Sequence, residues 1–172
     1  MVFLRTQRLI LRNLELIDGE TICKYRNNEN CARYQRWTDT SLSAVICMIE
    51  KYRSDLFLSQ QEEQHYAISL SDRTCIGDLS YFYSAKDNCI TLGITISPEY
   101  QRKGYAYEIL QKVIAAIQEK YPGADIVALI DPENDRSMGL FSKLGFVQEC
   151  YAPSISSYVY TIYGKPRGTE PR

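Results

Sequence analysis

The segment with the clearest chemical signal is a short polar loop between a predicted strand and a predicted long helix. The strand around Ile94-Thr95-Ile96 ends at Pro98, and the loop runs from Gln101 through Gly104 to Ala106. Backbone N–H groups at the start of a helix, aided by the helix dipole, bind anions. Gly104 would let a ligand approach the backbone closely, because glycine has no Cβ. The spacing therefore predicts an anion cradle.

Two positive charges, Arg102 and Lys103, lie at the rim of this loop. The loop is neither a Gly-x-x-x-x-Gly-Lys-Ser/Thr phosphate loop nor a Gly-x-Gly-x-x-Gly dinucleotide loop. The alternative to an anion cradle is a plain strand-to-helix turn with solvated charges.

A second candidate site follows a continuous apolar run. Ile126–Ile130 has strand length, and Asn134 after it is a favourable helix N-cap. Ser137 lies one helical turn later on nearly the same face. A hydroxyl at this position of a helix often bonds locally to the backbone.

Composition excludes several classes of protein. The chain has 172 residues, enough for one domain, and 20 basic against 21 acidic residues give a net charge of −1. This balance argues against non-specific nucleic-acid binding. No apolar run reaches the roughly 20 residues of a membrane span, and the N-terminus lacks a secretory leader, so we expect a cytoplasmic protein without a membrane partner. The six cysteines form no Cys-x-x-Cys pair, and His65 is the only histidine. We therefore expect reduced, mostly buried thiols and no metal site.

Periodicity predicts an α+β domain over residues 1–164, followed by a polar tail, 165–172, that frays. Strands come first and last, and Glu108 should pair with Lys112 along the longest helix. The expected order is β-α-α-β-β-β-α-β-α-β-β, with strands near 6–14, 66–70, 74–84, 89–97, 126–130, 146–150 and 156–163 and helices near 18–26, 41–57, 106–121 and 134–144.

The two candidate sites resemble the sequence motifs of one family. Gln101-x-x-Gly104-x-Ala106 after Ile96-x-Pro98 is similar to motif A of the GCN5-related N-acetyltransferases (GNAT). The second site agrees, with Asn134-Asp135-Arg136-Ser137 leading to Lys143-Leu144-Gly145-Phe146. The element order matches as well, so the resemblance covers nearly the whole chain.

The N-terminal part resembles one branch of that family. Thr6-Gln7-Arg8-Leu9-Ile10-Leu11-Arg12, together with Tyr34-Gln35-Arg36-Trp37, is similar to the ribosomal-protein N-terminal (RimJ/RimL-type) acetyltransferases. The two motifs are specific for the fold and the cofactor. The resemblance is only a weak indication of the acceptor.

The resemblance implies an α+β, GNAT-like fold. In it, a mixed, mainly antiparallel sheet splays between two strands and is flanked by about four helices. It also implies acetyl-CoA as co-substrate, without a metal. The diphosphate would bind the loop, and the pantetheine arm would extend the strand edge. The cofactor-binding residues implied in this way are Ile94, Thr95, Ile96, Gln101, Arg102, Lys103, Gly104, Tyr105, Ala106, Asn134, Ser137 and Phe141.

The catalytic groups depart from the family pattern. Many members have a tyrosine where Phe141 stands, and Phe141 cannot protonate a thiolate. Ser137 is therefore the candidate general acid. Thr91 occupies the strand position that often holds a glutamate base, and the base stays unassigned, with Glu29 and Tyr158 as guesses.

An amine acceptor should bind near an aromatic pocket. Tyr34, Trp37 and Tyr158 are the candidates, because aromatic faces attract cations. The acceptor would be a protein N-terminus or a small-molecule amine that attacks the thioester directly. A homodimer is left open. The alternatives are a non-catalytic acyl-CoA-binding or regulatory module of the same fold, and a nucleotide-binding regulator.

Overall fold

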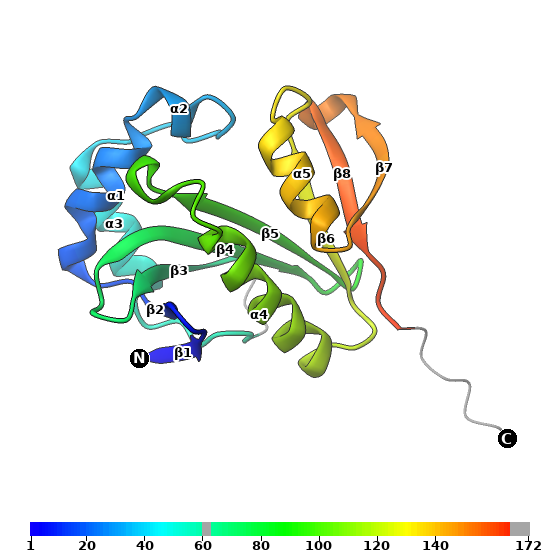
Figure 1. Cartoon of the computed structure of the whole chain (residues 1–172), viewed down its shortest axis with the longest axis horizontal. Coiled ribbons are helices and arrows are strands. Elements are labelled where there is room, and N and C mark those ends of the chain that lie inside the picture. The colour runs from blue at the N-terminus through cyan, green and yellow to red at the C-terminus, as the bar shows by residue number, and fades with distance from the viewer. Residues whose placement is uncertain (60–62, 166–172) are drawn as a thin grey trace, which may run out of the picture.

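The computed structural model describes residues 1–59 and 63–165, and within these ranges eight strands form one mixed sheet (Figure 1). The strand order is β1-β2-β3-β4-β5-β6-β8-β7, and only β5 and β6 run parallel. The strands are β1 (Val2–Arg5), β2 (Leu9–Asn13), β3 (Glu63–Leu70), β4 (Cys75–Ser84), β5 (Cys89–Ile96), β6 (Asp125–Ile130), β7 (Val147–Ala152) and β8 (Ser157–Ile162).

The described ranges also contain five α-helices, one more than the sequence predicted. They are α1 (Gly19–Arg26), α2 (Glu29–Ala32), α3 (Leu42–Tyr52), α4 (Tyr105–Lys120) and α5 (Asp135–Lys143). The predicted α+β class and the predicted order are confirmed, with β1 and α2 as additions. Helix α3 ends at Tyr52 rather than near residue 57, so Leu56 lies beyond its apolar face and is 58% exposed.

Helices cover both faces of the sheet. Figure 1 shows α4 on one face, with α1 and α3 gathered over the other. Alternating strand residues supply the two cores. Tyr66 and Leu79 face α4, where Val113 is fully buried, whereas Ala67 of β3 packs with the α1 and α3 side chains. Each fully buried aliphatic side chain contributes about 1.5–3 kcal/mol.

Strand β6 is packed on one face only. Ile126, Ala128 and Ile130 are buried, but Leu129 between them is 46% exposed. The prediction that the run 126–130 is buried on both faces is therefore wrong. A continuous apolar run does not distinguish a doubly covered strand from one whose second face lines a cavity.

The sheet opens between β5 and β6. In the described residues their ladder has three pairs and ends at Thr91 opposite Val127. Beyond this point β5 stays paired with β4 up to Ile96, and β6 stays paired with β8 up to Ile130. The two strands diverge while each keeps its other neighbour, which is the predicted splay.

The cysteines are all free thiols, but the prediction that most are buried is wrong. Cys31 and Cys75 are buried, whereas Cys47 and Cys150 are exposed. Across residues 1–59 and 63–165, no helix is long and apolar enough to cross a membrane. The same ranges hold no cluster of three or more His, Cys, Asp or Glu side chains suited to a metal ion.

The chain end is described only as far as Lys165, whose N–H donates to Pro122 O at 2.6 Å. The rest of the tail that was predicted to fray, residues 166–172, lies outside the described residues.

A buried ion pair links β2 to the start of α1. Arg12 is 1% exposed and donates from both terminal nitrogens to the Asp18 carboxylate, at 2.7 Å each. Asp18 Oδ2 also accepts from the Glu15 N–H at 2.8 Å. Both charges are thus paired and hydrogen-bonded, as buried charges must be.

We predict that Asp18→Ala lowers the free energy of unfolding by about 3–5 kcal/mol, because it leaves the buried Arg12 charge with only the more distant Glu15 carboxylate, at 4.0 Å. Urea denaturation measures this loss. Glu20→Ala, at an exposed position in the first turn of α1, is the matched control and should change stability little. A loss from Asp18→Ala no larger than that of the control would show that the pair does not hold this corner together.

Candidate functional site

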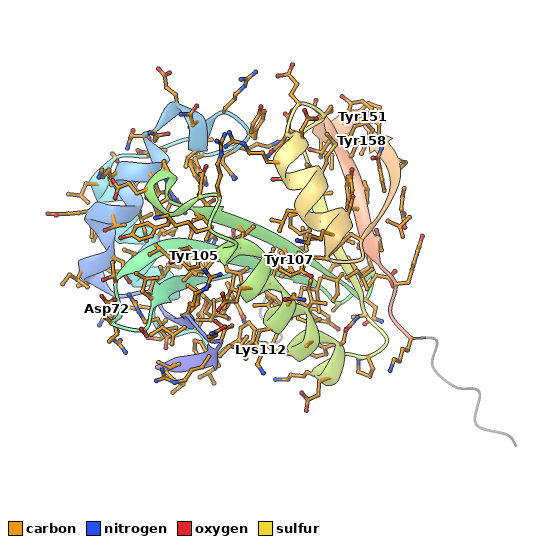
Figure 2. All side chains as sticks on the ribbon, viewed as in Figure 1. Asp72, Tyr105, Tyr107, Lys112, Tyr151 and Tyr158 are labelled. Carbon is orange, nitrogen blue, oxygen red and sulfur yellow. The ribbon has the colours of Figure 1, made fainter. Side chains whose placement is uncertain are left out.

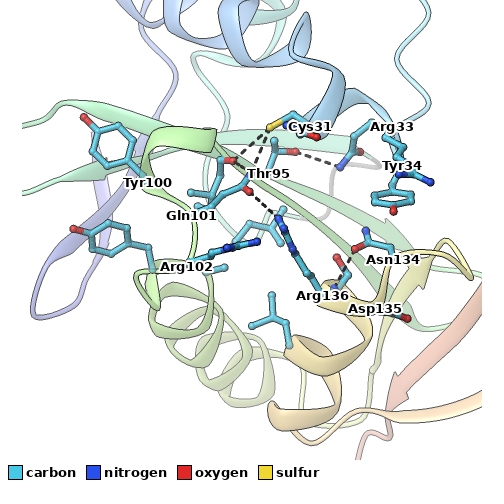
Figure 3. Close-up of a pocket in the computed structure, with 18 of the residues that line it drawn as sticks. Cys31, Arg33, Tyr34, Thr95, Tyr100, Gln101, Arg102, Asn134, Asp135 and Arg136 are labelled. Atoms are coloured by element: carbon cyan, nitrogen blue, oxygen red, sulfur yellow. Dashed lines mark hydrogen bonds between the residues drawn. The ribbon is translucent and has the colours of Figure 1, made fainter.

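A large cavity of about 630 Å³ lies where β5 leaves β6 (Figure 3). Its wall comes from the second half of β5, the loop before α4, the first turns of α4 and α5, and the segment around α2. The sequence-predicted residues in this wall are Ile94, Thr95, Ile96, Gln101, Arg102, Gly104, Tyr105, Ala106, Asn134, Ser137 and Tyr34.

Two predicted cofactor residues lie outside this wall. The Lys103 ammonium folds back on the loop and donates to Glu99 O at 2.9 Å. Phe141 is buried in the core, where its ring meets the Phe146 ring edge-on at 5.0 Å. Phe141 lies on the apolar face of α5, which points away from the cavity. Its ring therefore packs in the core and does not line the cavity wall.

The predicted aromatic pocket is not formed as one group. Tyr34 lines the cavity, but Trp37 packs beside α1, with the Arg26 guanidinium 4.9 Å from its ring centroid. Tyr158 lies at the β7–β8 end of the sheet, next to Tyr151 at 5.6 Å between ring centroids (Figure 2). Aromatic composition predicted these residues, but composition does not tell which segments the fold brings together.

The loop before α4 has the backbone shape of an anion cradle. Arg102 and Gly104 have φ of 61° and 80°, in the left-handed region. In the described part of the chain, the Gln101 N–H donates to Pro98 O at 3.3 Å, and the next N–H that finds an acceptor is that of Glu108, which donates to Gly104 O at 3.0 Å. The preceding N–H groups at the helix start therefore stay available to a ligand.

Side-chain contacts hold the cradle in place. Gln101 Nε2 donates to Ile96 O at 2.8 Å and lies 3.5 Å from the Cys31 sulfur, while Gln101 Oε1 accepts from Arg136 at 3.5 Å (Figure 3). Gln101 thus joins the end of β5 to α2 and α5. Cys31 and Arg136 are two wall residues that sequence reasoning did not assign. For Arg136 the second motif was the available signal in the sequence. Cys31 had no such signal, because α2 is too short to show a helical period.

The N-terminal segment braces the first turn of α4. The Glu108 carboxylate accepts from Thr6 Oγ1 at 2.5 Å and from Arg8 Nε at 2.7 Å, and Arg8 Nη1 donates to Lys103 O at 3.0 Å. The predicted Glu108–Lys112 pair is therefore wrong, because the β1–β2 loop occupies this carboxylate. Burial raises the pKa of Glu108, but the Thr6 and Arg8 hydrogen bonds outweigh it and lower the pKa below its ordinary value.

Asn134 acts as the predicted helix cap. Its side-chain oxygen accepts from the Ser137 N–H at 3.2 Å. Ser137 is half-buried, lines the cavity and lies on the same side of α5 as Asn134. The cap fixes the start of α5 and with it the backbone position of Ser137.

A smaller cavity of about 200 Å³ adjoins the preceding residues of β5, and sequence reasoning missed it. Thr91 and Gly93 line it, with Ser80 and Phe82 from β4. Phe82 is 44% exposed, and the half-exposed Leu129 of β6 lies in the same wall. A lone glycine within a strand was the available signal, since it often marks a close approach to the backbone.

Both cavities meet β5 at the splay. Residues 91–93 line the small cavity and residues 94–96 line the large one. The ladder to β6 ends at Thr91, so the unpaired edge of β5 runs between them. Two binding spaces thus converge on one open strand edge.

This geometry and the sequence motifs agree with a comparison to known families. Residues 8–147 match the family model of the acetyltransferase (GNAT) domain. The chain is a GNAT acetyltransferase. The resemblance seen in the sequence is confirmed by this match.

The relatives of this acetyltransferase point the same way. An uncharacterised N-acetyltransferase, p20 of Bacillus licheniformis, is 29% identical over 151 residues, covering 87% of this chain and 84% of the relative. A putative ribosomal-protein-serine acetyltransferase from Vibrio cholerae shares the fold with a TM-score of 0.78 at 23% identity, over 95% of this chain and 97% of that one. Spermidine N-acetyltransferase from Vibrio cholerae, in complex with CoA and spermine, has a TM-score of 0.69 at 21% identity, over 90% and 94%.

We predict that Glu108→Gln destabilises the acetyltransferase at pH 7 and that the difference from wild type narrows in acid. A carboxyl group whose pKa is lower in the folded state than in the unfolded state stabilises the fold at pH values above its unfolded-state pKa, near 4.3 for glutamate. This contribution is lost as the pH falls through the lower pKa of the folded state. Urea denaturation at pH 7 and at about pH 3.5 measures both differences. Glu119→Gln, at an exposed position on α4, is the control. Equal stability of Glu108→Gln and wild type at pH 7 would contradict the brace.

Proposed function

We propose that this acetyltransferase transfers the acetyl group of acetyl-CoA to a primary amine, with the co-substrate in the large cavity and the amine in the small one. The observation that carries this proposal is the end of the β5–β6 ladder at Thr91, which joins the two cavities along one strand edge. Direct attack of an amine on a thioester needs both reactants side by side in this way.

The loop before α4 suits a diphosphate. Its free N–H groups stand at the positive end of the α4 dipole, and Arg102, Arg136 and Arg33 add charge to the cavity wall. The relative that is bound to CoA and spermine supports this assignment, because it shares the fold over 90% of this chain.

The open edge of β5 suits the pantetheine arm. From Leu92 to Ile96, the backbone groups of β5 on the side toward β6 lack a strand partner in the described chain. An extended ligand can occupy such an edge by strand-like hydrogen bonding. Asn134 and Ser137 stand across the cavity, where an amide and a thiol would pass.

Positioning and charge stabilisation supply the rate. A bound thioester supplies an activated acyl group, and an N–H on the β5 edge can stabilise the negative charge that develops on its carbonyl oxygen. We assign the proton for the departing thiolate to Ser137, which lines the cavity, rather than to Phe141, whose ring is buried in the core.

The small cavity suits an ammonium group on an apolar stem. Glu63 contributes a carboxylate to its wall, while Phe82 and Leu129 contribute apolar surface. Both acceptor classes expected from the sequence, a protein N-terminus and a small-molecule amine, present such a cation. Three further predictions from the sequence stay predictions. They are the single domain ending at residue 164, the cytoplasmic location and the possibility of a homodimer.

Release of free thiol from acetyl-CoA tests the proposal. We expect release to accelerate at least tenfold over the buffer rate with one or more members of a panel of ethylamine, spermidine and short peptides with free N-termini. Mass spectrometry should then detect the acetylated amine. Binding of CoA without amine-dependent release would contradict the proposal and favour a non-catalytic acyl-CoA-binding module.

Gly104→Val tests the cradle separately. A Cβ built at Gly104 meets nothing closer than Arg8 Nη2, at 3.4 Å, so the protein itself has room for it. The φ of 80° costs a branched residue about 1–2 kcal/mol, which leaves the fold in place. We expect calorimetry to show loss of CoA binding. Gly139→Val, in open space on α5, is the control. Unchanged affinity for CoA in Gly104→Val would contradict the cradle.

A further inference from the structure

The small cavity lies on the face of the sheet that carries α1 and α3. Ala67 of β3 packs with these helices, and Glu63 lies four residues earlier on the same strand, so its side chain points to the same face. Glu63 is paired directly with Phe82 of β4, and Phe82 is paired with Thr91 of β5. Side chains at directly opposed positions share a face. This row of three therefore crosses the sheet from β3 to the strand that borders the splay.

Gly93 leaves a notch at the splay end of this row. It follows Thr91 by two residues, so it belongs to the same face, and it lies beyond the last pair of the β5–β6 ladder. A Cβ built on Gly93 would clash with Ser80 Oγ, so this hydroxyl bounds the space that the glycine leaves open. Gly93 and Ser80 both line the small cavity. A nitrogen in the notch would thus lie beside the open edge of β5.

Phe82 separates Glu63 from β5. Its half-exposed ring in the cavity wall offers apolar surface to a hydrocarbon stem. Neighbouring strands are about 4.8 Å apart, so about 10 Å of sheet separates the backbone of Glu63 from that of Thr91. The open edge lies on the far side of β5. We therefore expect Glu63 to bind a different group of the acceptor from the nitrogen that reacts.

Glu63 supplies the charge of the small cavity. Among the described residues that line it, Glu63 is the only charged one, and its side chain is about half exposed. The carboxylate accepts from the Tyr52 hydroxyl, and His65 Nε2 lies 3.4 Å from Oε1. The Tyr52 hydrogen bond lowers the pKa of Glu63 below its ordinary value, against the opposing effect of partial burial. The carboxylate therefore stays negative near neutral pH.

One ammonium group already lies beside this carboxylate. The Lys51 ammonium is 3.8 Å from Glu63 Oε2 and donates to the Tyr52 hydroxyl at 2.6 Å. The Lys51 charge also interacts with the Asp55 carboxylate, so Lys51 does not neutralise Glu63 alone. The position is thus suited to an ammonium group, and the cation of a ligand would share Glu63 with Lys51.

We propose that the preferred acceptor is a small linear amine with a second ammonium group, which Glu63 binds while the reacting nitrogen occupies the notch at Gly93. This inference rests on the proposed function and narrows its acceptor. The hydrocarbon stem lies over Phe82, and Leu129 of β6 adds apolar surface from the other side of the splay.

A protein N-terminus fits this arrangement less well. Its α-amine is a single cation, and the groups that follow it along the backbone are neutral amides, which give Glu63 no charged partner. Its α-carbon also carries a side chain and a carbonyl group, whereas the notch at Gly93 is one missing side chain. A linear diamine presents an unbranched carbon at the reacting end and a charge at the other.

Two amines of equal stem length test the second cation. Hexamethylenediamine carries an ammonium group at both ends, whereas hexylamine carries one. For the wild type we expect kcat/KM in thiol release to be about tenfold or more higher with the diamine, well above the about twofold advantage of two equivalent ends, because only the diamine adds a charged hydrogen bond. Glu63→Gln should lower kcat/KM for the diamine about tenfold and that for hexylamine less than about twofold.

Lys51→Gln gives a test of opposite sign. It removes the cation that shares Glu63, so we expect the ratio of diamine to hexylamine kcat/KM to rise about threefold. Glu50→Gln makes the same charge change as Glu63→Gln at an exposed position on α3, and as the control it should leave the ratio unchanged. A purely structural role of Glu63 would affect both amines alike. Calorimetry with CoA checks that the variants keep the co-substrate site.

Filling the notch tests the reacting end. In the double variant Gly93→Ala/Ser80→Ala, the new Cβ lies 3.8 Å from the Cβ of residue 80, an ordinary contact, so the fold has room for it. We expect kcat/KM for both amines to fall about tenfold or more while CoA still binds. Ser80→Ala alone keeps the notch open and should retain more activity than the double variant. Full activity of the double variant would contradict the notch.

The remaining outcomes separate the acceptor from the reaction. If Glu63→Gln folds poorly, the ratio measured for Lys51→Gln decides. An unchanged ratio in both variants, or faster wild-type release with hexylamine or short peptides than with the diamine, would overturn the second-cation site and leave the proposed function standing. Absence of amine-dependent thiol release in the wild type would instead overturn the proposed function.

Discussion

The architecture depends on one interruption of backbone hydrogen bonding. β5 and β6 share three pairs and then separate, and each strand keeps its partner on the other side. Backbone groups on an open edge need partners, so such an edge is costly unless something fills it. Here the edge is flanked by a helix start on one side and by a glycine-lined cavity on the other. The cradle and the cap on α5 are both arranged around it.

Local signals in the sequence predicted a large share of this fold. The period of the apolar residues in α4, the glycine before it and the Asn134 cap each depend on neighbours within a few residues. The element order and the ligand loop from Gln101 to Ala106 followed from them, whereas the role of the strand edge 94–96 was implied by the family resemblance. These features are predictable because short-range sterics and hydrogen bonds determine them.

The remaining features depend on contacts between distant segments. Glu108 pairs with Thr6 and Arg8 rather than with Lys112, and nothing within α4 indicates this. Trp37 and Tyr158 carry the same aromatic signal as Tyr34, yet only Tyr34 lines the large cavity. The small cavity is lined by residues of four strands, β3 to β6. Their register brings these residues together, and a single sequence predicts no register beyond the pattern of its faces.

The brace between the N-terminal segment and α4 also bears on how this protein can be handled. Thr6 and Arg8 contact the first turn of the helix whose N–H groups form the cradle, and the Asn13 N–H donates to Met1 O at 3.0 Å. The first residues of the chain are thus part of the architecture around the ligand loop. A purification tag fused at Met1 would therefore adjoin the segment that braces the ligand loop.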